Sequence, residues 1–162
     1  MNKKIYPMCQ AAMIAALYVV LTFVSNAFGM ASGPVQVRLS EAFTVLPYFT
    51  PAAIPGLAIG CLLSNWLTGC LAPDILFGTI ATLIGALGSY SLRRYPWLVP
   101  LPPVLANTLI VPWVLRFAYG AEDAIPFMML TVGAGEIISC YVLGLIFLYA
   151  LKKYGASLFE TH

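Results

Sequence analysis

Charged residues are scarce in this chain. They make up 9% of its 162 residues, with eight basic and six acidic side chains and a formal net charge of +2, whereas a soluble domain carries roughly 25% charged residues. This small net charge, without a basic patch among aromatic residues, argues against nucleic-acid binding. Hydrophobic residues reach 61%. We therefore expect an integral membrane protein in the lipid bilayer, where each helical span takes about 20 apolar residues.

Motifs for catalysis, metal binding and phosphate binding are also missing. The single histidine is His162, and the four cysteines form no C-x-x-C pair, so no metal cluster is predicted and the cysteines are interpreted as small buried apolar residues. The chain has no G-x-x-x-x-G-K-[ST] loop, no H-E-x-x-H and no Ser-His-Asp or Cys-His pairing. We expect no enzymatic activity and no cofactor. If the protein moves a solute uphill, the energy must come from a partner or an ion gradient.

Long uncharged runs predict where the chain crosses the membrane. Four spans follow from apolar length alone: Tyr6 to Phe28, Pro73 to Leu92, Trp97 to Ala118 and Ile125 to Leu151. The region between the first two is too long for one span, and Pro47, Pro51 and Pro55 interrupt it, because proline removes a backbone hydrogen bond from a helix interior. We expect a short segment over 40–48 and a full one over 52–71, or a re-entrant loop at 47–55.

Basic pairs at the ends of these segments predict the orientation. With six segments, Lys3-Lys4, Arg93-Arg94 and Lys152-Lys153 fall on one side of the membrane, and Glu122-Asp123 falls on the other. Basic flanks favour the cytoplasm. The prediction is an all-α bundle of six transmembrane helices, with a short, proline-broken second helix and both termini in the cytoplasm. No repeat or polar linker interrupts it, so residues 1–162 are expected to form one transmembrane domain.

Polar residues within the apolar segments gather in the outer half of the expected bundle. With a helical rise of 1.5 Å per residue, Glu136 and Asn107 lie roughly 15 Å deep and Asn65 roughly 9 Å deep. Arg38 and Glu41 open the short segment at its outer end. A charge buried in a membrane costs at least ~2.5 kcal/mol, so such residues usually face the bundle interior and mark a site. The pattern predicts a cavity open to the outside.

Structural roles for some of these residues remain open. Arg38 could pair with Glu41 at the interface, where Glu41 would also face the positive end of a helix. Asp74 stands in the first turn of a predicted helix, where helix capping is the favoured role. In "VGAGEIISC", two glycines before Glu136 leave room for another group to approach.

The first segment carries a face of small residues near its cytoplasmic end. In "QAAMIAALY", alanines recur four residues apart in two overlapping pairs, Ala11 with Ala15 and Ala12 with Ala16. Small residues at this spacing let another helix approach closely in lipid. The approaching helix could belong to a partner protein or to the same bundle.

Three segments resemble the QueT family of queuosine-precursor transporters: "VQVRLSEAFTVLPYFTPAAIPGLAIGCLLSN", "DILFGTIATLIGALGSY" and "PPVLANTLIVPWVL". The members of that family are substrate-binding S components of energy-coupling factor (ECF) transporters of the bacterial plasma membrane. The resemblance implies a six-helix fold, a solute held near the outer face, and partners comprising a transmembrane T component and two ATPase subunits. It also implies that Ala11, Ala12, Ala15 and Ala16 match the A-x-x-x-A motif that docks on the T component.

The same resemblance implies a 7-deazaguanine solute, such as queuine, preQ1 or preQ0. A carboxylate accepts two adjacent N–H donors of a guanine-like edge, and Glu136 is the candidate. Asn107 or Asn65 would add donor and acceptor contacts, and Trp113 or Tyr119 a stacking face. Arg38 would order the loop over 29–39 or pair with Glu41. Two alternatives stay open: an S component for another flat, vitamin-like solute, and a membrane assembly protein whose polar residues only tie helices together.

Overall fold

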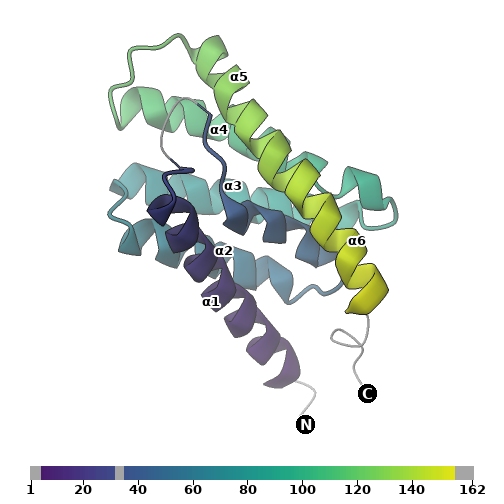
Figure 1. Cartoon of the computed structure of the whole chain (residues 1–162). Helices are drawn as coiled ribbons and strands as arrows, with labels where there is room; N and C mark the ends of the chain where they lie inside the picture. The colour runs from purple at the N-terminus through teal and green to yellow at the C-terminus, as the bar shows by residue number, and fades with distance from the viewer. Residues whose placement is uncertain (1–4, 32–34, 156–162) are drawn as a thin grey trace.

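Helices alone build the part of the chain that the computed structural model describes, residues 5–31 and 35–155 (Figure 1). In chain order the elements are α1 (Ile5–Ala27), η1 (Leu39–Tyr48), α2 (Ala53–Leu67), α3 (Ala72–Ser91), η2 (Pro96–Leu98), α4 (Leu101–Phe117), α5 (Ile125–Glu136), η3 (Ile137–Leu143) and α6 (Gly144–Tyr154). The all-α prediction is confirmed for these ranges. Lys3-Lys4 and His162 lie outside them, as does part of the predicted loop over 29–39.

Four helices are long and apolar enough to cross a membrane: Ile5–Ala27, Ala72–Ser91, Pro96–Phe117 and Ile125–Tyr154. They coincide with the four spans predicted from apolar length. The last of them runs without a break through α5, η3 and α6 over 30 residues. The apolar helix α2 is shorter, at 15 residues. The chain is therefore a multi-pass helical membrane protein, and six crossings remain a prediction.

The proline-rich region forms a short helix followed by a turn. The 3₁₀ helix η1 has 10 residues and contains Pro47. The amides of Phe49 and Thr50 both donate to the carbonyl of Leu46, at 2.9 and 3.2 Å, and α2 begins three residues after Thr50. Runs of 3₁₀ helix longer than about four residues are uncommon, and most side chains of η1 are buried. The surrounding helices therefore hold η1 in place, inside the bundle.

Helices α1 and α2 are in backbone contact. A Cβ atom at Gly56 would lie 2.8 Å from the carbonyl oxygen of Ala11, and one at Gly60 would lie 2.8 Å from Cβ of Tyr18 and 3.1 Å from Cα of Ala15. Only glycine fits such close approaches. Two of the four alanines in the predicted small-residue face, Ala11 and Ala15, are thus covered by α2 of the same chain.

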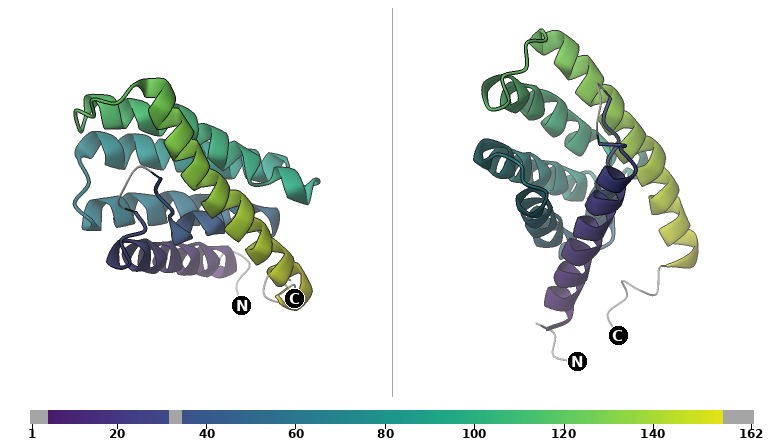
Figure 2. Two further views of the ribbon diagram at one scale, coloured as in Figure 1. Left: turned by 45° about the horizontal axis from the view of Figure 1, so that its top comes forward. Right: turned by 60° about the vertical axis from the view of Figure 1, so that its left-hand side comes forward.

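A cluster of apolar side chains joins the three segments on this side of the bundle. Tyr18 of α1, Leu46 of η1 and Leu57 of α2 pack together as buried core residues. The N-terminal end of α1 and the C-terminal end of α6 lie at the same end of the molecule (Figure 2). The opposite end of α1 therefore lies at the far end of the bundle, beside the end of α2 and the start of α3.

Candidate substrate-binding cavity

Glu41 of η1 is a carboxylate buried inside the bundle. Its exposed fraction is 3%. One oxygen, Oε1, accepts a hydrogen bond from the hydroxyl of Tyr18 at 2.5 Å. The other, Oε2, is buried and has no hydrogen-bond partner within the described residues. An unsatisfied buried acceptor costs free energy, and an exception of this kind in a native fold points to a function such as ligand binding.

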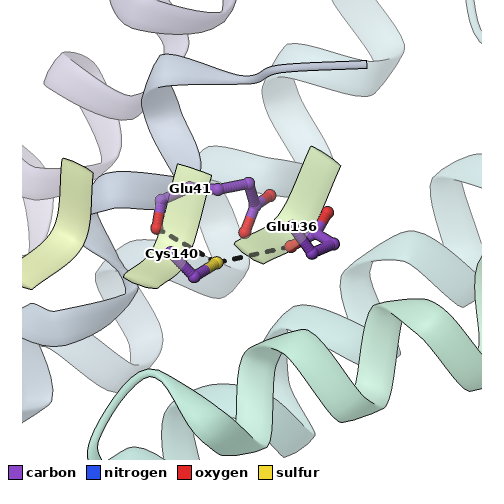
Figure 3. Close-up of side chains that lie close together, drawn as sticks. All are labelled: Glu41, Glu136 and Cys140. Carbon is purple, nitrogen blue, oxygen red and sulfur yellow. Dashed lines mark hydrogen bonds between the residues drawn. The ribbon is translucent and has the colours of Figure 1, made fainter. Parts of the chain in front are cut away.

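Glu136 and Cys140 reach the same place from the long C-terminal helix (Figure 3). They stand four residues apart, and the thiol of Cys140 donates to Oε2 of Glu136 at 3.3 Å. The helix changes to π geometry directly after Glu136, and π turns within α-helices often occur at functional sites. One carboxylate oxygen of Glu41, one of Glu136 and the Sγ atom of Cys140 all lie within 4.8 Å of one another. The three side chains face a common point.

These residues belong to an inner chamber of about 30 Å³. Its polar lining residues are Gln36, Arg38, Glu41, Asn65, Asp74, Thr82, Asn107 and Glu136. Five of the six predicted substrate-binding residues are among them. Asn107 lies beside the carboxylate of Glu136. The structure thus brings together polar residues that are up to about a hundred positions apart in the sequence.

A larger outer cavity of about 350 Å³ adjoins the chamber. The two share four lining residues, Gln36, Arg38, Asn65 and Asp74, which we call the neck. The outer cavity extends from the neck to Tyr119, in the loop after α4. Its walls come from the C-terminal ends of α1, α2 and α4 and the start of α3, so it lies at the end of the bundle away from the termini.

The backbone over 36–39 is fixed between α1 and the long C-terminal helix. The amide of Arg38 donates to Oγ of Ser139 at 3.1 Å, and the amide of Leu39 donates to Oγ of Ser25 at 2.9 Å. A Cβ atom at Gly135 would lie 2.1 Å from the carbonyl oxygen of Gln36. The glycines before Glu136 were predicted to leave room for another group. At Gly135, the backbone of Gln36 fills that room.

Asp74 is at the neck and stands in the first turn of α3, directly after Pro73, as predicted from the sequence. An acidic side chain in this turn faces the positive end of the helix. Its carboxylate also makes a long-range contact, because the hydroxyl of Tyr119 donates to Oδ2 of Asp74 at 2.9 Å and accepts from the amide of Leu71 at 3.2 Å. Burial and the neighbouring Asp74 raise the pKa of Tyr119 to about 12. The hydroxyl thus stays protonated at neutral pH and ties the α4–α5 loop to the start of α3.

Trp113 lies outside both cavities. It is 46% exposed and stacks on Phe117, with ring centroids 6.0 Å apart. The two rings line an apolar groove that also includes Phe77 of α3. The structure does not bring Trp113 to the polar cavity, whereas Tyr119, the other predicted stacking residue, lines its outer part.

Tyr18, Asp74 and Cys140 belong to the site, and the sequence did not single them out for it. Tyr18 stands in a uniformly apolar run, so nothing local indicates that its hydroxyl meets Glu41. All four cysteines were interpreted as small buried residues. Cys61 and Cys140 are buried, whereas Cys9 is exposed and Cys70 is half-buried, so the interpretation is wrong for these two. The spacing of four between Glu136 and Cys140 was the available signal, because residues at i and i+4 share a helix face.

Fold and site together define a multi-pass helical membrane protein with a buried, carboxylate-rich cavity at one end of its bundle. The chain belongs to the QueT transporter family, whose model matches residues 8–153. Over 83 residues it is 35% identical to a protein of Lactococcus lactis subsp. cremoris (strain MG1363) described as queuosine precursor transporter QueT. That match covers 51% of this chain and 48% of the relative, about half its length. No solved structure matches the chain.

Proposed function

We propose that this chain is the substrate-binding S component of an ECF-type importer that takes up a queuosine precursor, a 7-deazaguanine. The observation that carries the proposal is the buried Oε2 atom of Glu41, which has no partner among the described residues, in a carboxylate that lies near a second one, that of Glu136. A purely structural polar cluster would pair its members with one another. A site for a ligand rich in N–H donors leaves acceptors free for it.

The surrounding residues suit such a ligand. Carboxylates accept N–H groups in parallel pairs, while Asn65 and Asn107, which also line the chamber, offer both donors and acceptors. The ring of Tyr119 at the outer cavity offers a stacking face for a flat heterocycle. Membership of the QueT transporter family and the description of the Lactococcus relative favour a queuosine precursor over another vitamin-like solute.

Energy for uptake would come from partners. The sequence has no phosphate-binding G-x-x-x-x-G-K-[ST] loop, so ATP hydrolysis is assigned to two ATPase subunits, joined to this chain through a T component. The proposed docking surface is the outward face of α1 at Ala12 and Ala16, which are exposed, since Ala11 and Ala15 pack on α2. The proposed location is the bacterial plasma membrane, with both termini cytoplasmic and the cavity open to the outside.

The test is ligand binding by the purified chain in detergent. Queuine, preQ1 and preQ0 are compared with riboflavin and thiamine by thermal stabilisation and calorimetry. We expect at least one 7-deazaguanine to bind, and Glu136→Gln to weaken its binding roughly 10- to 100-fold, because a hydrogen bond to a charged group is worth about 1.5–3 kcal/mol. Glu122→Gln makes the same chemical change on an exposed loop residue and should leave the affinity unchanged.

Three results would argue against the proposal. Stabilisation by a vitamin and by no 7-deazaguanine would favour the S component of another solute. No binding of any compound by the folded chain would favour a membrane assembly protein. Unchanged affinity in folded Glu136→Gln would remove Glu136 from the site.

A further inference from the structure

The apolar groove beside Trp113 takes no part in the proposed binding of the solute. It lies between α3 and α4 and has a volume of about 350 Å³, within the range of roughly 300–1,000 Å³ typical of small-molecule sites. A polar solute would lose its hydrogen bonds to water there, because every side chain of the lining is apolar. The lining residues are Pro73, Phe77, Leu109, Ile110, Trp113, Val114, Phe117 and Ala118.

The packing of α3 against α4 explains why the groove is open. Toward the end of the bundle that holds the termini, the two backbones are in contact, because a Cβ atom at Gly85 would lie 2.8 Å from Cα of Pro103. Toward the other end, the large rings of Trp113 and Phe117 stack on each other, with an interplanar angle of 7°. Both rings are exposed. The chain therefore leaves a space between the helices that its own side chains do not fill.

The length and position of the groove match one leaflet of a bilayer. Its wall on α4 runs from Leu109 to Ala118, which at 1.5 Å per residue is about 14 Å. Half of a hydrocarbon core of roughly 30 Å is about 15 Å. The membrane-spanning helix Pro96–Phe117 ends at the mouth of the groove, so the groove extends inward from the membrane surface. An acyl chain of this leaflet, the outer one in the predicted orientation, has the direction and the chemistry to fill it.

Charged side chains stand at the surface end of the groove. Arg116, in the last turn of α4, is exposed, and its Nη1 atom donates to the carbonyl of Ala121 at 2.9 Å. A guanidinium has five N–H donors, so others remain for a phosphate, which arginine can bind in a bidentate manner. The exposed acidic residues Glu122 and Asp123 follow Ala121. A headgroup with both a phosphate and an ammonium group therefore suits this end.

We infer that the groove binds one zwitterionic phospholipid, with an acyl chain between α3 and α4 and the phosphate on Arg116. The lipid braces the wall of the polar cavity. Pro73 and Ala118 of the groove directly precede Asp74 and Tyr119, whose side chains are hydrogen-bonded at 2.9 Å beside that cavity. A bound lipid should therefore raise the unfolding temperature of the chain.

The experiment follows the quenching of Trp113 fluorescence by phosphatidylethanolamine brominated on one acyl chain, added to the purified chain in detergent. The chain has three tryptophans, and Trp66→Phe with Trp97→Phe leaves Trp113 alone. We expect the quenching to saturate at one lipid per chain. A second chain that keeps only Trp66 is the control, because Trp66 is exposed on α2 and does not line the groove. Its quenching should rise with the lipid content of the micelle and should not saturate.

Two variants test the two halves of the site. Ala118→Phe places a ring in the groove and should weaken lipid binding at least 10-fold, whereas Ala150→Phe makes the same change on an exposed face of α6 and should not. Arg116→Gln keeps a donor but removes the charge, so its affinity should fall about 10-fold, the lower factor for a hydrogen bond to a charged group. Arg94→Gln, at an exposed position after α3, is the control for that change. Diacylglycerol with the same chains should bind the wild-type protein as weakly as the phospholipid binds Arg116→Gln, and this comparison needs no variant that folds.

Equal quenching curves for Trp113 and Trp66 would show an annular lipid only and would overturn the inference. Diacylglycerol binding as tight as phospholipid binding would overturn the assignment of the phosphate to Arg116. If Ala118→Phe bound lipid normally but no longer co-purified with partner subunits, the groove would belong to a partner helix, which would also overturn the inference. Each of these results would leave the proposed binding of the solute standing.

Discussion

Gly135 sets the position of the backbone that carries Arg38 to the neck. Because a Cβ atom there would lie 2.1 Å from the carbonyl oxygen of Gln36, Gly135→Ala must push this segment away from the long helix. We expect the variant to lose about 1–3 kcal/mol of stability, typical of overpacking, and to bind preQ1 more weakly. Thermal unfolding in detergent and calorimetry measure the two effects.

Gly133→Ala is the matched control for this prediction. The nearest atom to a Cβ at Gly133 is Oγ1 of Thr108 at 3.3 Å, and that side chain can shift slightly. Both variants gain the same advantage of alanine over glycine in a helix, about 0.5–1 kcal/mol. A Gly135→Ala protein as stable and as tight-binding as Gly133→Ala would show that the contact with Gln36 does not hold the neck.

Individual site residues differ in how well the sequence could reveal them. Glu136 and Asn107 stand alone in apolar helices, where the cost of burying a polar group leaves few places except a cavity. An acidic residue in the first turn of a helix is common, because it stabilises the positive end of the helix. This local role explained Asp74 from the sequence alone, so its long-range bond to Tyr119 was not predicted. Trp113 was selected for its ring and its depth, neither of which indicates the face of α4 to which it belongs.

At the scale of elements, the two neighbouring alanines Ala15 and Ala16 of α1 allow a sharp comparison. Ala15 is 5% exposed and lies against Gly60 of α2, whereas Ala16 is exposed on the outward face. We expect Ala15→Leu to force α1 and α2 apart and to lower stability by about 1–3 kcal/mol. Ala16→Leu adds the same volume toward lipid and should leave the unfolding temperature unchanged. Equal unfolding temperatures would contradict the backbone contact.

Which elements could be predicted depended on how local their causes are. Proline removes a hydrogen bond wherever it stands, so the break between η1 and α2 was predicted within a few residues. The 3₁₀ geometry of η1 and the π geometry over 137–143 have no such local signal. Both occur where the chain packs around the carboxylates of Glu41 and Glu136, and that packing depends on contacts far apart in the sequence.

At the scale of the whole molecule, the first prediction concerns sidedness. Ser91 and Glu122 are exposed at opposite ends of the bundle. In a background lacking Cys9 and Cys70, the cysteines that are not buried, a membrane-impermeant maleimide should label Glu122→Cys on intact cells. It should label Ser91→Cys only after permeabilisation. Labelling of both variants on intact cells would overturn the six-segment topology.

The second prediction at this scale concerns the docking of partners. A bulky side chain on the outward face of α1 should prevent the close approach of a partner helix, because interfaces between small residues in lipid depend on van der Waals contact. We expect Ala16→Trp to abolish uptake and co-purification of the partner subunits while preQ1 binding by the isolated chain survives.

Ala150→Trp makes the same change at an exposed position of α6 and should retain uptake. An Ala16→Trp protein that still transports and still co-purifies would show that this face of α1 does not dock a partner. Loss of ligand binding in Ala16→Trp would show that the effect lies in the bundle itself and would contradict a separate docking face.

The glycine contacts between α1 and α2 have a mechanical consequence. Two helices whose backbones touch at Gly56 and Gly60 cannot slide or tilt independently without a clash, so α1 and α2 form one rigid unit. Ala12 and Ala16 lie at one end of this unit, and Asn65 lies at the other end, at the neck. Any tilt of α1 that a partner imposes would therefore move α2 with it and displace one wall of the cavity.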